Sequence, residues 1–398
     1  MFDLRLRHSL LLLGLLPGLG NAIELLDERL ELNAYGTLGQ TRSSLEAPPY
    51  KLAPAFQYGV ADQWSSVLDN RLGAQLTFNA NEQLSFITQV LVRRNGEDDV
   101  RNQTTWLYAR WRPDEHWEAR LGRIRQPLFL ITEEFDVGYS QPWVRPPVEL
   151  YSLAGESIFI DGAQLRYQTA LGDYTLRLEG HHGHMELDRD PLYDLQNTYN
   201  SGLAVTLTDG SLTLRGSLLQ AHTKLDSPRR QRVVDLIAAQ DPGVAEDYDT
   251  TDIPRQRYAN LGLRYEDGDW LVMAEYVRLW LEKPSMPDKQ AYYLTLGHSF
   301  GDFTPYATYA RQEVISSLNE YRLSGVPARA ANALLSASNS EQHSYSLGVR
   351  WDFSPGLALK GQVDQVYQRN AAYGLQNAQL PAGREHFTVT SVVLDWAF

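Results

Sequence analysis

The chain of 398 residues has no cysteine and no long apolar run. Without cysteine it can form no disulfide framework, no thiolate zinc cluster and no thiol nucleophile. Beyond the amino terminus, no stretch approaches the roughly 18 continuous apolar residues that a membrane helix needs. Basic residues are also few, 36 against 49 acidic ones, which argues against nucleic acid as a partner. If this chain enters a membrane, it does so as strands.

The amino terminus has the pattern of an export signal. Basic residues precede an apolar run from Leu10 to Leu16, and small residues then lead to Ala22. The apolar run is too short to span a bilayer. We therefore expect a cleaved signal peptide over residues 1–22 and a mature protein over 23–398, with a buried amphipathic helix as the alternative.

Apolar and polar residues alternate through most of the mature sequence. Between residues 71 and 78, for example, one face carries Leu72, Ala74, Leu76 and Phe78, and the other carries Arg71, Gly73, Gln75 and Thr77. A period of two residues is typical of a strand with one polar face. We count about sixteen such segments, of which the last ends on Trp396 and Phe398 and needs a neighbouring strand to pair with.

The connections between these segments fall into two alternating kinds. Short turns are expected near residues 80, 114, 170, 209, 268, 301 and 355. Long polar connections are expected near 40–65, 94–103, 126–157, 181–198, 225–255, 282–289, 315–341 and 370–383. This plan predicts an all-β fold: a transmembrane antiparallel β-barrel of about sixteen strands, with short periplasmic turns and long extracellular loops.

The alternative architecture is a secreted soluble sandwich or propeller. The polar face argues against it, because a sandwich core cannot take up its charges, which include Arg93, Arg110, Arg120, Arg166, Arg177, Arg215, Arg264, Arg350 and Lys360. Aromatic residues also cluster beside the short turns, as a girdle at the membrane surface requires: Phe78, Trp111, Trp117, Tyr167, Tyr174, Trp270, Phe300, Phe303, Trp351 and Trp396.

The third long connection is the candidate functional segment. It covers about thirty residues and contains four prolines, and structureless loops of such length are usually functional. Its acids are Glu133, Glu134 and Asp136, and the preceding strands direct four arginines into the lumen: Arg71, Arg93, Arg110 and Arg120. Acids opposite arginines would set a transverse field across a pore constriction and favour small polar solutes. The alternatives are a solvated loop carboxylate for each acid and a local ion pair for each arginine.

With this plan, the mature chain resembles the sixteen-stranded porins of Gram-negative outer membranes. The resemblance is carried by the strand and loop order, by Leu121-Gly-Arg-Ile-Arg-Gln-Pro-Leu-Phe129 and by Trp396-Ala-Phe398. The segment from Asp136 to Tyr151 looks like a poorly characterised porin-like group and departs from the short Pro-Glu-Phe-Gly-type loops of general porins.

The resemblance implies a location and partners. It implies an outer-membrane barrel, reached by export, with the third loop folded into the lumen. It also implies a homotrimer in contact with outer-membrane lipids and lipopolysaccharide, and a carboxyl-terminal strand that the barrel assembly machinery recognises.

Three further segments invite other interpretations. His181, His182 and His184 with Glu186 could bind a metal, but a polar rim is favoured because the spacing alone shows no convergence. The acidic stretch Asp241 to Asp252 lacks the regular calcium-loop pattern, so a solvated loop is expected. Arg229 to Gln240 is expected to form a short helix, a lid over the mouth. No cofactor follows from any of them.

The leading functional hypothesis is a passive porin, not an enzyme, for small hydrophilic solutes and ions. A substrate-selective channel is the alternative within the same class, and the preference for cations or anions stays open. An outer-membrane hydrolase would need Ser157 with the His181 to His184 cluster, but no Gly-x-Ser-x-Gly motif supports it. A structural or adhesion barrel with a plugged lumen is the fourth hypothesis.

Overall fold

The computed structural model describes residues 23–25, 29–47, 49–52, 59–94, 100–154, 159–188, 194–316, 322–338, 341–368 and 385–398. Sixteen antiparallel strands form a closed barrel in which each strand pairs with the next and β17 pairs with β2. They are β2 (Leu30–Ser43), β3 (Arg71–Asn79), β4 (Leu84–Arg94), β5 (Val100–Trp111), β6 (Trp117–Arg125), β7 (Phe159–Leu171), β8 (Tyr174–Asp188), β9 (Asp194–Thr208), β10 (Leu212–Asp226), β11 (Ile253–Glu266), β12 (Trp270–Leu281), β13 (Lys289–His298), β14 (Phe303–Val314), β15 (Gln342–Ser354), β16 (Leu357–Gln368) and β17 (His386–Ala397). The expected fold is confirmed.

The remaining elements are short. A strand β1 (Ile23–Leu25) pairs with the start of β2. The connection between β6 and β7 contains the 3-10 helices η2 (Thr132–Glu134) and η3 (Gly138–Ser140) and one turn of α-helix, α2 (Val148–Tyr151). Longer connections contain α3 (Pro228–Ala238), α4 (Pro242–Tyr248) and α5 (Gly325–Ser338). No helix in the described ranges is long and apolar enough to cross a membrane.

The seven short turns lie where the sequence places them, and two of them share one design. In each, an aspartate side chain accepts hydrogen bonds from two backbone N–H groups, and a glycine follows with φ of 97°. The pairs are Asp209 with Gly210 and Asp267 with Gly268. Because only glycine adopts this backbone conformation freely, the Asp-Gly signal fixes the turn and with it the strand register.

The outer face of the barrel is apolar. Large side chains exposed there include Leu72, Leu107, Leu121, Leu165, Leu203, Leu218, Leu261 and Leu347, each at least 49 % exposed. Seven of the predicted girdle residues are also exposed: Phe78, Trp111, Trp117, Trp270, Phe300, Phe303 and Trp351. Trp396 differs, because it packs over Gly36 of β2 and is only 9 % exposed. An apolar surface of this extent needs lipid around it, which excludes the soluble alternative.

The barrel closes through the last strand. β17 pairs with β2 from Val389↔Ser43 to Ala397↔Tyr35, and Phe398 and Ala34 exchange both backbone hydrogen bonds beyond it. Along β17 the odd-numbered residues from Phe387 to Val393 are buried, and the even-numbered residues between them face outward, as the alternation in the sequence predicts.

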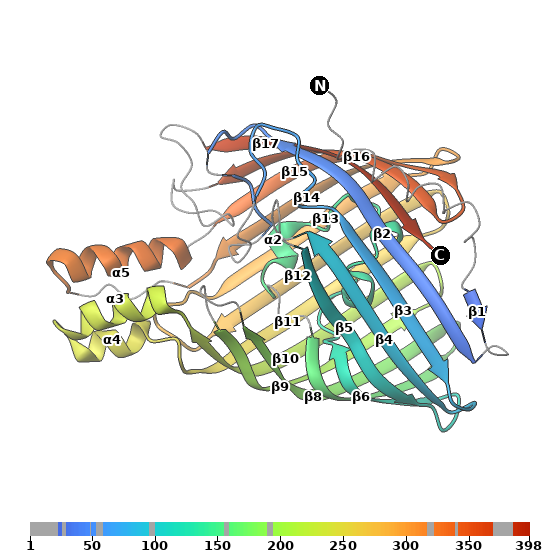
Figure 1. Ribbon diagram of the computed structural model, residues 1–398, viewed down its shortest axis with the longest axis horizontal. Coiled ribbons are helices and arrows are strands. Elements are labelled where there is room, and N and C mark those ends of the chain that lie inside the picture. The colour runs from blue at the N-terminus through green and yellow to red at the C-terminus, as the bar shows by residue number, and fades with distance from the viewer. Residues whose placement is uncertain are drawn as a thin grey trace.

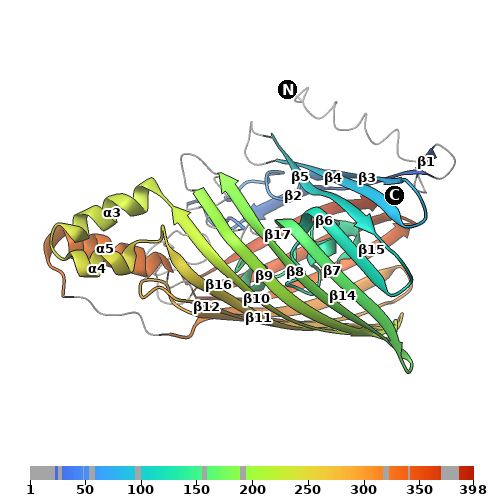
Figure 2. The same ribbon diagram turned by 90° about the horizontal axis from the view of Figure 1, so that it is seen from below.

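The helices α3, α4 and α5 pack together beyond the ends of the strands, at the opposite end from β1 (Figures 1 and 2). They share an apolar core of Val234, Ile237, Ala245, Tyr248 and Ala331. The expected helix from Arg229 to Gln240 is therefore present as α3. The acidic stretch from Asp241 starts α4, where the Asp241 carboxylate caps the helix by accepting from Val244 N at 3.1 Å.

Candidate pore constriction

Loop 3, the connection between β6 and β7, is described over residues 126–154 and is folded into the barrel. Figure 1 shows α2 of this loop inside the outline formed by the strands. Its apolar side chains join the largest buried cluster of the described chain, together with inward residues of β10 to β14; the loop contributes Leu128, Phe129, Ile131, Trp143, Leu150, Tyr151 and Ala154. Burial of this surface holds the loop against one side of the wall.

Trp143 anchors the middle of loop 3. Its indole N–H lies 3.0 Å from Thr295 Oγ1 and 3.1 Å from Thr308 Oγ1, and its ring meets Tyr293 edge-on with 5.5 Å between ring centroids. The side chain is 1 % exposed. Because both the apolar ring and the single donor of the indole find partners on β13 and β14, this position is tightly specified.

Lys360 of β16 fastens the same part of the loop by its backbone. The ammonium group donates to the carbonyl oxygens of Gly138, Gln141 and Trp143 at 2.7, 2.6 and 3.1 Å. It also forms an ion pair of 2.8 Å with Asp395 of β17, and both side chains are fully buried. A lysine has three donors and no acceptor, so it matches a turn that presents carbonyl groups.

Arg145 ties the loop to three further elements. It forms an ion pair of 2.6 Å with Asp69 and lies 3.8 Å from Asp364 of β16. It also donates to Thr41 Oγ1 of β2 at 3.1 Å and to Ser391 Oγ of β17 at 2.5 Å. The arginine is 6 % exposed. A buried charge of this kind is stable only with such a complete set of partners.

The start and the end of loop 3 are both fixed to Glu275 of β12. Glu275 accepts hydrogen bonds from Tyr151 Oη at 2.6 Å and from the backbone N–H of Leu130 at 2.7 Å. Next to Tyr151, burial raises the pKa of Glu149, which accepts from Gln342 Nε2 of β15 at 2.8 Å. Loop 3 is thus attached to β10 to β17 and to β2.

Of the three predicted loop acids, Glu133 pairs with wall arginines. Its carboxylate lies 2.9 Å from Arg120 Nη1 and forms a second, shorter ion pair with Arg166 of β7. The protein surroundings disfavour the charged form of Glu133, but the two guanidinium groups outweigh this and lower its pKa to about 2. Glu133 is therefore ionised at every physiological pH.

The other two acids have different surroundings. Asp136 is 5 % exposed and forms a buried ion pair with Arg125, the last residue of β6. It therefore holds the loop in place instead of facing an opening. Glu134 is exposed and lies 4.0 Å from Arg264 of β11. It lines a cavity of about 220 Å³ between loop 3 and β7 to β11, together with Arg166, Arg177 and Arg264.

The four predicted arginines lie on the inner face of β3 to β6. Arg71 and Arg93 are direct partners across β3 and β4, and Arg110 and Arg120 are direct partners across β5 and β6. Arg110 donates to Ser85 Oγ at 3.2 Å, and Arg120 lies over the Tyr108 ring at 5.2 Å. Like charges placed opposite each other are unfavourable in a sheet unless water or anions screen them.

In the described part of the chain, loop 3 makes no polar contact with the strands that carry Arg71, Arg93 and Arg110, whereas Arg120 pairs with Glu133 of the loop. Among the described residues, no hydrogen bond or ion pair joins residues 126–154 to β3, β4 or β5. The sequence located the loop, its acids and the wall arginines. It did not predict Arg125, Arg166 and Lys360 as partners of the loop or Arg145 as its anchor, although the inward parity of Arg166 and Lys360 was readable.

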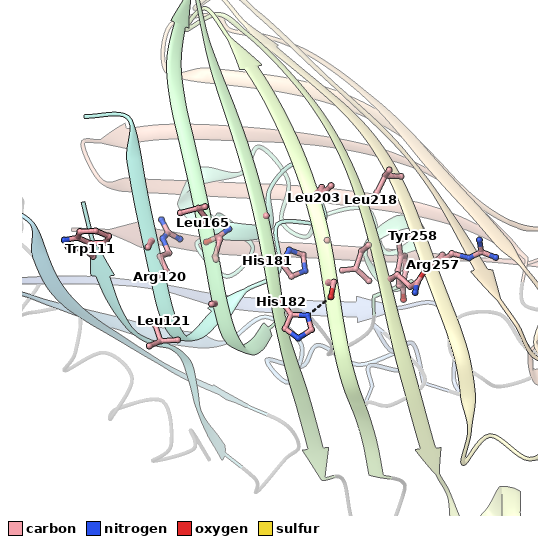
Figure 3. Close-up of a pocket in the computed structure, with 18 of the residues that line it drawn as sticks. Trp111, Arg120, Leu121, Leu165, His181, His182, Leu203, Leu218, Arg257 and Tyr258 are labelled. Atoms are coloured by element: carbon pink, nitrogen blue, oxygen red, sulfur yellow. Dashed lines mark hydrogen bonds between the residues drawn. The ribbon is translucent and has the colours of Figure 1, made fainter. Parts of the chain in front are cut away.

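The histidines show no metal site or catalytic pair of the expected kind. His181 and His182 are neighbours on β8 and point to opposite sides of the wall (Figure 3). His181 is buried and lies 3.0 Å from Asn200 Oδ1, whereas His182 lies on the outer face, 2.7 Å from Ser201 Oγ. No group of three potential metal ligands converges within the described residues. Ser157, the proposed nucleophile, lies outside them.

A closed barrel of sixteen strands with an apolar belt and a folded-in third loop defines a porin-like barrel of the outer membrane. Comparisons with known proteins agree on the fold. No family model matches the chain, and no curated protein matches its sequence.

Solved structures do match over nearly the whole chain. The anion-selective porin of Comamonas acidovorans is 16% identical with a TM-score of 0.58, covering 93% of this chain and 99% of that one. OmpF of Salmonella typhi, in complex with daunomycin, is 11% identical with a TM-score of 0.58, covering 94% and 100%. The trimer form of OmpT, an outer membrane protein of Vibrio cholerae, is 12% identical with a TM-score of 0.52, covering 92% and 99%. The chain has the fold of the porin-like barrels of Gram-negative outer membranes.

Proposed function

We propose that the protein is a passive channel for small hydrophilic solutes and ions, with a pore constricted by loop 3. The observation that carries this proposal is the distribution of the contacts of loop 3. The loop is hydrogen-bonded or ion-paired to β6, β7, β10 to β17 and β2, whereas within the described residues no such contact joins it to the arginine-bearing strands β3 to β5. A lumen with charged walls holds water, and water-filled barrels conduct.

The constriction has an unequal charge distribution. Glu133 and Asp136 are each held by arginines, so they neutralise part of the basic wall. Arg71 has no acidic partner within the described residues, and Arg110 has only a serine. In this proposal the eyelet is basic on the side of β3 to β5, and the loop acids Glu133 and Asp136 lie paired with arginines of β6 and β7. Such an opening favours polar solutes and holds apolar ones back.

Swelling of proteoliposomes tests passive diffusion. Vesicles containing the purified protein should swell in isotonic solutions of neutral sugars, at rates that fall smoothly with the size of the sugar. Vesicles with folded protein that do not swell in any sugar would refute an open channel and support a plugged structural or adhesion barrel.

A substrate-selective channel is the second candidate within this class. The observation that favours it is the helical module of α3, α4 and α5, whose own apolar core gives the extracellular side a preformed surface. Selective transport would show as unequal rates for sugars of equal size together with saturation. Equal rates would leave the general porin as the better description.

We infer that the chain has no catalytic role. His182 and Ser201 meet on the lipid-facing side, where the neighbouring backbone N–H groups are used by the strand ladder and leave no oxyanion donors. A fluorophosphonate probe that labels a serine stoichiometrically, with loss of labelling in a His182→Ala variant, would overturn this view.

The partners follow from the outer surface. Outward Arg257, Arg278 and Arg311 lie towards the extracellular ends of their strands, where they suit phosphate groups of lipopolysaccharide among the outer-membrane lipids. A homotrimer is proposed by analogy with the trimer form of OmpT. Cross-linking in native membranes should give a ladder that ends at three chains.

Biogenesis completes the proposal. Residues 1–22 would direct export and be removed, and β17 would be the strand that the assembly machinery recognises. Residues 1–22 lie outside the described part of the chain. Sequencing of the amino terminus of protein from outer membranes should begin at Ile23, and a blocked or intact Met1 would contradict cleavage.

A further inference from the structure

One buried hydroxyl group in the lumen wall has no partner. Tyr35 of β2 is 5 % exposed, and its phenolic oxygen accepts or donates no hydrogen bond within the described residues. The ring lies directly over Gly73 of β3, where any Cβ atom would overlap it, so the position of the hydroxyl is fixed by packing. A buried hydroxyl left without a partner costs about 1–3 kcal/mol, which a suitable ligand would recover.

Arg71 lies beside this hydroxyl. It is two residues from Gly73 on the inner face of β3, opposite Thr37 of β2 and Arg93 of β4. Its Nε atom is buried and has no hydrogen-bond partner, and no ion pair neutralises its guanidinium group within the described residues. Because Tyr35 is the direct partner of Gly73, its side chain and that of Arg71 are neighbours on the inner face of β2 and β3.

Arg125, the last residue of β6, also has a donor that is unused within the described residues. Arg125 uses one side of its guanidinium group for Asp136 and Thr132 O, and its Nε atom is also unpartnered. A guanidinium group with an unused donor beside an unused O–H is the complement of an oxyanion, because phosphate and carboxylate offer only acceptor atoms.

We propose that Tyr35 and Arg71 form an anion subsite in the pore, which holds the carboxylate or phosphate group of a passing solute. The inference rests on the proposed channel and names its preferred solutes as small organic or inorganic anions. Arg71 supplies the charge and the planar pair of donors, and Tyr35 supplies a directed O–H. Arg93, the partner of Arg71 on β4, adds positive charge beside the site. Water is the alternative occupant, and it would give no preference among solutes.

The test is the single-channel current of the intact protein in planar bilayers bathed in potassium chloride, with inorganic phosphate or acetate added. Both anions should reduce the chloride current in a saturable way. Tyr35→Phe, which removes only the hydroxyl, should weaken the apparent affinity for phosphate about fivefold. Arg71→Gln should weaken it by about tenfold or more and should shift the reversal potential in a salt gradient towards cations.

Arg177→Gln serves as the matched control, because Arg177 also faces the lumen, and its side chain binds only Gln168 among the described residues. It should leave phosphate block within about twofold of the original protein. Arg71→Lys, which keeps the charge, should retain the reversal potential and lose part of the block. If phosphate and acetate block equally in all variants, or not at all, the subsite is refuted while the channel stands. Absence of any current would refute the channel itself.

Discussion

Replacing Arg145 by methionine is the sharpest perturbation of loop 3. The substitution keeps most of the side-chain volume and removes the charge that is shared by Asp69, Asp364, Thr41 and Ser391. Asp69 is 3 % exposed, so its carboxylate would be left buried without a cation. Breaking one side of a buried ion pair costs about 3–5 kcal/mol. Much of this strain would be relieved by release of the loop segment around Trp143 from β2, β16 and β17.

Two measurements follow from that release. In urea unfolding of the barrel in lipid vesicles, Arg145→Met should lower the free energy of unfolding by about 3 kcal/mol or more. In planar bilayers its current should become noisier, with a larger mean conductance. A second variant, Asp69→Asn on top of Arg145→Met, should recover part of the stability, because the orphaned charge is gone. Unchanged stability and unchanged conductance in the single variant would refute the view that the loop is held by this contact.

Three further predictions concern the same loop. Lys360→Met should destabilise the barrel by about 3–5 kcal/mol in urea unfolding, since it leaves Asp395 buried without a cation and takes one donor from each of three loop carbonyls. It should also raise the conductance, and no change in either quantity would contradict this attachment of the loop. Trp143→Ala should cost about 3–5 kcal/mol in the same assay, and a loss below about 1 kcal/mol would mean that the ring is not packed as described. The pKa of Glu133 falls from 4.5 to about 2, so its ion pairs contribute stability that is complete above about pH 4.5 and is lost as the pH falls through about 2. The conductance should therefore stay constant from about pH 7 to about pH 5. A step in conductance within that range, present in the original protein and absent in Glu133→Gln, would show the pairing to be wrong.

The strand plan was predictable because its signals are local. Alternation at residues 71–78 sets the two faces of one strand without reference to any other, and Asp209-Gly210 sets a turn within four residues. Closure of the barrel then follows, because with an even number of strands the last strand, β17, runs antiparallel to the first, and its apolar residues face outward like those of the other strands. For the same reason, the direction of Arg71 and Arg120 into the lumen could be derived from position alone.

The partners of the loop acids were not predictable in the same way. The sequence placed Asp136 at an opening, whereas the structure buries it against Arg125, because the path of loop 3 across the lumen decides which charges meet. That path depends on contacts between residues far apart in the chain, such as Arg145 with Ser391 and Lys360 with Gly138. No periodicity in the sequence encodes such a pairing.

The single-channel current of the purified protein in planar bilayers tests the central claim most directly. A barrel whose loop 3 makes no polar contact, within the described residues, with the arginine-bearing strands β3 to β5 should give stable, ohmic current steps. In a potassium chloride gradient the reversal potential should indicate a preference for chloride, because Arg71 and its neighbours line that side of the lumen. Folded, inserted protein that gives no steps, or steps with a clear preference for potassium, would contradict this account of the pore.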